Sequence, residues 1–269
     1  MNDQKVSFLI GVYNESSRIR DCLDSVKQQT YPNIEIVIAD DGSTDDTVEV
    51  IKNYIKENND LDIKLVENEE NIGLTKSLNK GIEHCSGKYI ARLDADNVCL
   101  PERVGKQVDF LEKNNDFALV GSFNNKKFTD GREDINKFEV SPEKIKKNLI
   151  HSCQMTHSSI MVRADILKEY RYNEKYKTSQ DYELYVRLAQ KWKIGAIPEP
   201  LVVSEVRSDS ISGKKSKWER FKRYTAIRWR AYRGLGHPWW HIIYVFKGLY
   251  DLLLPRFLTS HINKLRSHE

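Results

Sequence analysis

VSFLIGVYNESSRIRDCLDSVKQQTYPNIEIVIADDGS, residues 6–43, contains one complete strand–helix–strand unit. Residues 6–13 and 34–39 are mostly apolar and rich in side chains that favour strands. The segment between them carries Leu23 and Val26 at a spacing that suits a helix. Parallel strands joined by a helix are the building unit of an α/β fold.

The same alternation continues along the chain. After Thr44 we expect a helix over 48–55, a strand at 63–66, a helix at 75–85, a strand at 88–93, a helix from Pro101 to Leu111 and a strand at 118–121. Residues 124–134 are polar and predict a loop, followed by a strand at 159–162, a helix over 181–190 and a strand at 194–197. The pattern predicts a Rossmann-like, mostly parallel mixed sheet flanked by helices on both faces.

The bulk composition is that of a globular intracellular protein. The chain has 269 residues, of which 39% are hydrophobic and 30% charged, enough to bury the core of one domain. Its four cysteines form no C-x-x-C pair, which argues against a zinc site or a disulfide framework and favours the reducing cytoplasm. The first residues lack a basic segment, so we expect no signal peptide.

Positive charge is concentrated at the C-terminal end. Residues 214–269 hold 13 Lys and Arg against 3 Asp and Glu, although the whole chain carries only +4. Small and basic residues from Ser208 to Lys217 separate this part from the rest. We therefore expect a catalytic domain at 1–212 and a basic helical tail at 213–269, the tail suited to a polyanionic surface.

Polar clusters follow three of the predicted strands. Residues 13–15, 40–43 and 94–97 stand where the apolar runs end, and in open α/β sheets ligands bind outside the carboxyl ends of the strands. Simpler roles exist for single residues, because Asp-Gly is a common turn and Ser43 or Thr44 can cap a helix. Three such clusters together predict a ligand site.

The residue types indicate a nucleotide diphosphate and a metal ion. Asp94 and Asp96 supply hard oxygen ligands for Mn²⁺ or Mg²⁺, and a diphosphate can complete the coordination. Tyr13 offers a ring for base stacking, and Asp41 can accept the N3–H of uracil or thymine. The chain has no Gly-x-Gly-x-x-Gly or Walker loop, which argues against dinucleotide oxidoreductases and P-loop enzymes.

The motifs resemble those of the family-two glycosyltransferases of the GT-A fold, close to bacterial enzymes that build surface polysaccharides. The matching segments are VSFLIGVYNE, EIVIADDGSTDDT, ENIGLTKSLNKGI, GKYIARLDADNVCLPERVGKQVDFLEKN, THSSIMVRADIL and SQDYELYVRLAQ. Together they span about residues 5–212. The resemblance implies an inverting transfer of a sugar from a nucleotide diphosphate.

The resemblance also implies roles for individual residues. Tyr13 and Asp41 match base contacts, Asp94 a ribose or metal contact, and Asp96 the principal metal ligand. The residues expected at the nucleotide are Val12, Tyr13, Glu15, Asp41, Lys76, Asp94 and Ala95. For Lys76, as for Arg92 and Arg163, phosphate binding and fold stabilisation both stay open.

Asp181 matches the family's catalytic base. An in-line displacement needs one carboxylate to take the proton of the acceptor hydroxyl, although Asp181 at the start of a predicted helix also suits an N-cap. Gln180 stands where the family usually has Glu, and Asn97 where a third Asp is frequent. The segment 207–212 lacks the family's usual His, which leaves Asp209 as the candidate for a third metal ligand. His157 suits a buried hydrogen bond and a ligand contact equally.

The tail permits two interpretations. Trp218, Phe221, Thr225, Trp229 and Tyr232 recur at helical spacing, and a second apolar stretch at 239–258 is broken by Lys247, Asp251 and Pro255. Such a stretch is too polar to span a bilayer but suits an anionic membrane interface. Alternatively, the aromatic stripe packs on the catalytic domain or on a second subunit. No motif accompanies the charge that would indicate nucleic acid.

The expected reaction transfers a sugar from a UDP or dTDP donor, with GDP left open, to a glycan or a lipid-linked acceptor. Two other classes remain, a metal-dependent nucleotidyltransferase and a non-catalytic nucleotide-sugar binding module. The first would release pyrophosphate instead of a nucleoside diphosphate. The second would not need Asp181. We expect the protein in the cytoplasm, with peripheral attachment to the cell membrane and a homo-oligomer as further alternatives.

Overall fold

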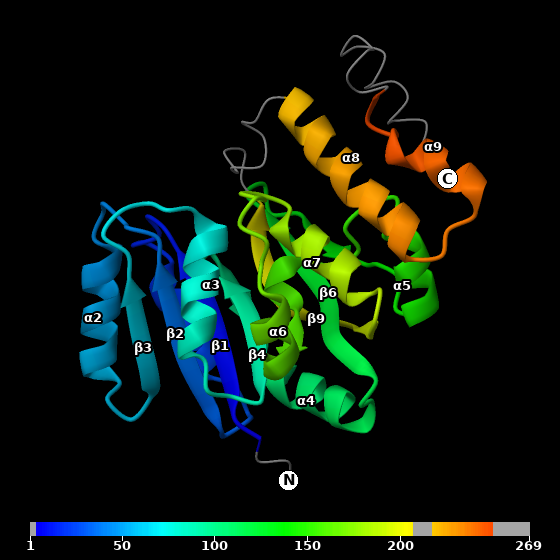
Figure 1. The fold of residues 1–269 in the computed structure, drawn as a ribbon. Coiled ribbons are helices and arrows are strands. Elements are labelled where there is room, and N and C mark those ends of the chain that lie inside the picture. The colour runs from blue at the N-terminus through cyan, green and yellow to red at the C-terminus, as the bar shows by residue number, and fades with distance from the viewer. Residues whose placement is uncertain (1–3, 207–216, 250–269) are drawn as a thin grey trace.

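The computed structural model describes residues 4–206 and 217–249. Nine strands of these residues form one sheet in the order β3-β2-β1-β4-β8-β6-β9-β5, with β7 paired to β6 (Figure 1). The strands β1 to β4 are parallel to one another, and β6 and β9 are also parallel. The predicted mostly parallel mixed sheet is confirmed.

The strands are β1 Val6–Val12, β2 Ile34–Asp40, β3 Asp62–Glu67, β4 Tyr89–Asp94, β5 Asn97–Cys99, β6 Phe117–Phe128, β7 Glu133–Asn136, β8 Met161–Arg163 and β9 Lys193–Val206. The helices are α1 Ile19–Lys27, α2 Thr47–Glu57, α3 Leu74–His84, α4 Arg103–Lys113, α5 Pro142–Asn148, α6 Ala164–Tyr170, α7 Gln180–Leu188, α8 Lys217–Gly234 and α9 Ile242–Val245. Two short 3-10 helices, η1 His157–Ser159 and η3 Trp239–His241, complete the set of described elements.

Apolar side chains of the central strands point to both faces of the sheet. In β1, Phe8 and Ile10 belong to the cluster beneath α1, α2 and α4, whereas Leu9 belongs to the cluster beneath α3, α6 and α7. Figure 1 shows α3 and α6 together on one face. Because both faces are covered, these strands are continuous apolar runs instead of alternating ones.

The prediction of a loop over 124–134 was wrong. The strand β6 continues to Phe128, and residues 124–127 pair with 133–136 of β7 in a hairpin. The predicted strand at 194–197 likewise extends to Val206 along β6. These extensions were missed because several of their side chains are partly exposed and polar, so that hydrogen bonding to neighbouring strands and not apolar periodicity stabilises them.

The first part of the tail packs on the preceding part of the chain, and one member of the predicted stripe, Tyr232, packs against the same core. In α8 the buried side chains are Ile227, Arg228 and Ala231, and Ile227 and Ala231 join the core beneath α7. Trp218 and Trp229 are exposed. None of the described helices is long and apolar enough to cross a bilayer. Positions 250–258 of the second predicted stretch lie outside the described residues.

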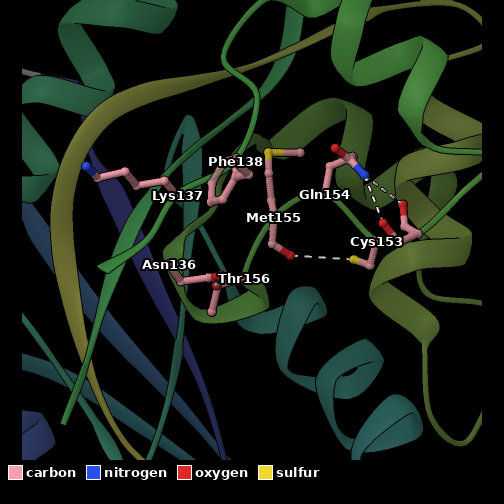
Figure 2. Close-up of a pocket in the computed structure, with 8 residues that line it drawn as sticks. Asn136, Lys137, Phe138, Cys153, Gln154, Met155 and Thr156 are labelled. Atoms are coloured by element: carbon pink, nitrogen blue, oxygen red, sulfur yellow. Dashed lines mark hydrogen bonds between the residues drawn. The ribbon is translucent and has the colours of Figure 1, made fainter. Parts of the chain in front are cut away.

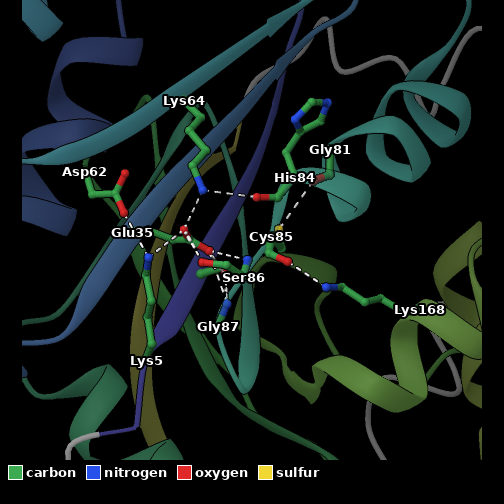
Figure 3. Close-up of polar contacts among 11 residues, drawn as sticks. Lys5, Glu35, Asp62, Lys64, Gly81, His84, Cys85, Ser86, Gly87 and Lys168 are labelled. Atoms are coloured by element: carbon green, nitrogen blue, oxygen red, sulfur yellow. Dashed lines mark hydrogen bonds and ion pairs between the residues drawn. The ribbon is translucent and has the colours of Figure 1, made fainter.

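A buried carboxylate closes the edge of the sheet where β1 and β2 begin (Figure 3). Glu35 is completely buried and accepts hydrogen bonds from Ser7 and Ser86, and Lys5 and Lys64 pair with it at 3.0 and 2.9 Å. Burial alone would raise the pKa of Glu35, but the hydrogen bonds from Ser7, Lys64 and Ser86 outweigh it and hold the pKa well below its usual range. The negative charge of Glu35 is therefore compensated by its partners at this edge of the sheet.

Candidate active site

Three strands end side by side at the opposite edge of the sheet. Val12 at the end of β1 is paired with Asp40 of β2, and Gly11 is paired with Asp94 of β4. The polar residues that follow these strands therefore meet, as their positions predicted. Val12 itself is buried, and its carbonyl oxygen accepts the N–H of Asp41 at 2.9 Å.

Asp41 is fixed by the start of α3. Its Oδ1 accepts hydrogen bonds from the backbone N–H groups of Ile72 and Gly73, both at 2.9 Å, and from Ser77 Oγ at 2.7 Å. All three donors converge on this one oxygen, so a uracil or thymine N3–H would need the other, Oδ2. Sequence reasoning found Asp41 but missed these partners, which belong to the ENIGLTKS segment.

The turn after β2 is built by Asp40. Its carboxylate accepts the backbone N–H of Ser43 at 3.0 Å and the Ser43 hydroxyl at 2.5 Å. The helix α2 begins only at Thr47, with Asp46 at its N-cap position, so neither Ser43 nor Thr44 caps it. The capping alternative for these two residues was wrong because the polar turn is longer than the sequence pattern indicated.

Two of the expected nucleotide contacts stand at the rim of this edge. The ring of Tyr13, directly after β1, is 40% exposed. Lys76 is exposed in the first turn of α3, the helix whose start contacts Asp41. A base can stack on the ring, and the ammonium group is accessible to a phosphate.

Asp94 is already paired within the protein. One carboxylate oxygen accepts from the guanidinium of the buried Arg92, and the other accepts from the Ser158 hydroxyl. Burial alone would raise the pKa of Asp94, but the charge of Arg92 and these two hydrogen bonds hold it below its ordinary value. Asp94 is therefore a stable anion whose oxygens are partly occupied.

Asp96 lies in a different environment. Burial, the neighbouring carboxylate of Asp94 and that of Glu15 raise its pKa to about 6, although Arg18 acts in the opposite direction. Glu15 itself is ion-paired with Arg18. Ala95, between the two aspartates, is buried. The site thus gathers more negative charge than its own cations neutralise, which favours a bound cation.

The donor set fits a divalent ion such as Mn²⁺ or Mg²⁺. Carboxylate oxygens suit these ions, and the raised pKa of Asp96 reflects the electrostatic cost that a cation would remove. Among the described residues no group of three or more His, Cys, Asp or Glu lies close enough to hold a metal. Oxygens of a bound diphosphate, together with water, would suit the remaining coordination positions. Asp209, the sequence candidate for a third ligand, lies outside the described residues.

Asp181 stands in the first turn of α7, which begins at Gln180 with Ser179 at its N-cap position. The alternative that Asp181 is the N-cap was wrong, because the helix starts earlier than the sequence pattern suggested. Ser179 has a φ of 61°, in the left-handed region that costs energy for residues other than glycine. Gln180 is buried beside Asp181.

One short segment, residues 153–158, contacts both groups of carboxylates. Cys153 Sγ lies 3.7 Å from Asp181 Oδ2, and Ser158 Oγ donates to Asp94. Between them, His157 Nε2 lies 2.7 Å from the Tyr172 hydroxyl. We call this run the bridging segment. Sequence reasoning singled out only His157 in it, because no local pattern marks a contact across the fold.

His157 of the bridging segment and the two arginines Arg92 and Arg163 are each engaged in contacts within the protein. Burial and the charge of Arg92 lower the pKa of His157 to about 4, so this ring is neutral at pH 7 and hydrogen-bonded to Tyr172. Arg92 is buried against Asp94, and Arg163 donates to the carbonyls of Phe117 and Leu111. Both arginines therefore stabilise the fold, which leaves Lys76 as the exposed cation of the three.

A cavity of about 330 Å³ opens along the bridging segment (Figure 2). It is lined by Asn136, Lys137, Phe138, Ser152, Cys153, Gln154, Met155 and Thr156. Figure 2 shows Cys153 and Met155 linked by a hydrogen bond from Sγ to the carbonyl oxygen, at 3.5 Å. Cys153, which lines the cavity, also contacts Asp181, the candidate base.

Comparison with known proteins agrees with this architecture. The model of the family "Glycosyl transferase family 2" matches residues 7–171. The chain is 30% identical to the putative glycosyltransferase EpsE of Bacillus subtilis, over 97% of this chain and 94% of that one. It is 28% identical to the UDP-Glc:alpha-D-GlcNAc-diphosphoundecaprenol beta-1,3-glucosyltransferase WfgD of Escherichia coli, over 83% and 85%.

Solved structures show the same fold. S. aureus TarS 1-349 in complex with UDP-GlcNAc superposes with a TM-score of 0.75 at 18% identity, covering 94% of this chain and 76% of that one. A mostly parallel sheet with carboxylates gathered at its strand ends defines a GT-A glycosyltransferase fold. With the family match over 7–171, the chain belongs to glycosyltransferase family 2.

Proposed function

We propose that the protein is a metal-dependent, inverting glycosyltransferase that uses a UDP or dTDP sugar and acts in the synthesis of a bacterial surface polysaccharide. The observation that carries the proposal is that one short segment, the bridging segment, contacts both Asp94 and Asp181. Asp94, whose neighbour in the sequence after Ala95 is Asp96, contacts its Ser158 end, and Asp181 contacts its Cys153 end. Asp94 and Asp96 would bind the metal ion and the diphosphate of the donor, and Asp181 would contact the acceptor hydroxyl.

The donor would bind at the strand ends. Tyr13 stacks on the base and Asp41 accepts its N3–H, while Lys76 contacts a phosphate. Val12, Glu15 and Ala95 surround the nucleotide. Asp96, assisted by Asp94, would hold Mn²⁺ or Mg²⁺, which when bound offsets the charge that grows on the departing diphosphate. The relative WfgD is named for a UDP-Glc donor, which supports this choice of nucleotide.

Asp181 would act as the general base. The acceptor hydroxyl loses its proton to this carboxylate, and its oxygen forms a bond to the anomeric carbon. The bond from that carbon to the diphosphate oxygen breaks, and the nucleoside diphosphate leaves with the electron pair. A single displacement of this kind inverts the anomeric configuration.

The acceptor would occupy the cavity along the bridging segment. Its polar lining, with Asn136, Lys137 and Gln154, suits the hydroxyl groups of a sugar. The name of WfgD specifies a sugar on diphosphoundecaprenol, which supports a lipid-linked acceptor here. We place the reaction in the cytoplasm at the membrane, since the four cysteines are free. Residues 1–212 would form the catalytic domain and 213–269 an appendage to it.

The decisive experiment compares the wild-type protein with Asp181→Asn. We expect the variant to bind UDP normally but to lose transfer by about two to four orders of magnitude, the usual contribution of a general base. Nucleotide sugars are first screened by thermal stabilisation with Mn²⁺, and products are then analysed by mass spectrometry. Asp165→Asn, on α6 and away from the bridging segment, serves as the control.

Near-normal transfer by Asp181→Asn would refute the assignment of the base. Release of pyrophosphate would instead identify a nucleotidyltransferase. Binding of a nucleotide sugar with no product from the wild-type protein and a lipid-linked acceptor set would favour a binding module. Thermal denaturation of each variant separates these outcomes from loss of folding.

A further inference from the structure

Large apolar side chains are exposed where the described chain turns back after α8. Trp239 is 76% exposed, Trp240 55% and Ile243 65%. Ile242 and Phe246 are also exposed. We call these five residues of η3, α9 and the following position the docking surface. In Figure 1, α9 lies outside α8, on the side away from the strands β1 to β4.

The backbone beneath the docking surface is held in place. Val245 and Leu235 are buried, and the rings of His151 and Tyr244 pack edge-to-face with centroids 4.3 Å apart. The Tyr232 hydroxyl donates to the carbonyl of Trp239 at 3.3 Å. The outward direction of the apolar side chains is thus a property of a packed element, and none of the described residues covers them.

Cations surround the same element. Lys146 and Lys147 of α5 are close enough to His237 to contribute to lowering its pKa, after burial and the ring of His241. Lys247 adjoins Phe246, and both it and Lys147 are exposed. Lys146, Lys147 and Lys247 therefore place positive charge beside the apolar side chains.

We propose that the docking surface inserts into the interfacial region of an anionic lipid bilayer. Exposed Trp and Ile with flanking Lys is the arrangement that an interfacial element needs, because rings and alkyl groups enter the acyl boundary while ammonium groups meet lipid phosphates. A second copy fits less well. In a two-fold dimer the surface would face itself and bring like charges together.

The docking surface is connected to the cavity beside Asp181. His151 packs on Tyr244 of α9 and on His241 of η3, and the next residues, 152–156, line the cavity. A protein seated on a bilayer through this surface would hold the cavity near the lipid headgroups. This part of the inference rests on the proposed function, because it serves a lipid-linked acceptor.

The test is sedimentation of the full-length protein with vesicles of phosphatidylcholine alone or mixed with phosphatidylglycerol. We expect binding to the anionic vesicles that weakens with added salt. The double variant Trp239→Ser/Ile243→Ser should lose about tenfold or more in partitioning. Lys147→Gln should lose about fivefold on anionic vesicles. Trp192→Ser, which removes an exposed Trp in the connection between α7 and β9, should bind as wild type.

Equal vesicle binding by the wild type and the double variant would overturn the proposal, as would absence of binding by the wild type. A changed oligomeric state in ultracentrifugation without a change in vesicle binding would assign the surface to a second copy. A lowered melting temperature alone would assign it to packing within the chain. Asp181→Asn should still bind vesicles, and the double variant should still glycosylate a water-soluble acceptor, so failure of either proposal is recognisable.

Discussion

At the scale of single residues, Asp94 and Asp96 are two neighbouring carboxylates with different tasks. Asp94 is held by Arg92 and Ser158, whereas Asp96 has a pKa raised to about 6 by burial, Asp94 and Glu15. A carboxylate that is costly to ionise in the empty protein gains most from a cation. Asp96 is therefore the residue on which metal affinity should depend most.

We predict that Asp96→Asn weakens UDP binding in the presence of Mn²⁺ by about 100-fold, to the level that the wild-type protein shows in EDTA. Calorimetry with and without EDTA measures both affinities. The exposed Asp62→Asn, at the far edge of the sheet, is the control. If EDTA leaves the UDP affinity of the wild-type protein unchanged, the metal role of Asp96 is wrong.

The residues with chemistry of their own could be found from the sequence, but their partners could not. Asp94 and Asp96 follow an apolar run and can be located by position alone. Ser158, which bonds to Asp94, is 64 residues later in the chain. Cys153, which contacts Asp181 in the folded protein, lies in a segment without a periodic apolar pattern. Contacts of this kind depend on how distant elements pack, which local patterns do not encode.

At the scale of elements, the backbone at the N-cap position of α7 is strained, and this position lies next to Asp181, the candidate base. Ser179 has a φ of 61° and accepts no capping hydrogen bond through its side chain, unlike Ser141 of α5, which accepts from the N–H of Lys144. We predict that Ser179→Gly raises the free energy of unfolding by about 0.5 kcal/mol, because glycine adopts this conformation without steric cost.

The matched change Ser141→Gly should have the opposite sign and lower the free energy of unfolding by a few tenths of a kcal/mol, about the cost of losing a serine cap to glycine. Urea denaturation of both variants measures the two values. If Ser179→Gly destabilises the protein as much as Ser141→Gly, then the left-handed conformation is not a source of strain.

Elements with a clear apolar period were predictable, and those stabilised by pairing were not. The strands β1, β2 and β4 are buried and continuous, so their residues identify them. The outer part of β6 and the short β7 are mostly polar and at least partly exposed, and pairing with neighbouring strands, β7 with β6 and β6 with β9, stabilises them as strands. The hairpin matters for the site because Asn136 at its end lines the cavity.

At the scale of the whole molecule, carboxylates at the two edges of the sheet act in opposite directions on pH stability. Glu35 has a lowered pKa, so its contribution is complete above the ordinary value of 4.5 and is lost as the pH falls below it. Asp96 has a raised pKa, so its ionisation lowers the stability as the pH rises from the ordinary value of 3.8 to about 6, and this loss is complete above that pH.

We predict that Glu35→Gln lowers the free energy of unfolding by about 3 kcal/mol at pH 7, because Lys5 and Lys64 lose their buried partner. The difference between variant and wild type should shrink as the pH falls below 4.5. Urea denaturation at pH 7, 5 and 3 measures it. A difference that does not change with pH would show that Glu35 acts through packing instead of charge.

The bridging segment has a thermodynamic consequence. Ser158 at one end bonds to Asp94, in the proposed donor site, and Cys153 at the other end lines the cavity proposed for the acceptor. Under the proposed function, a shift of this backbone caused by one substrate would alter the free energy of binding the other. Such coupling is reciprocal, so the factor by which the nucleotide changes acceptor affinity equals the factor by which the acceptor changes nucleotide affinity. Six residues of backbone would thereby couple the affinities of the enzyme for its two substrates.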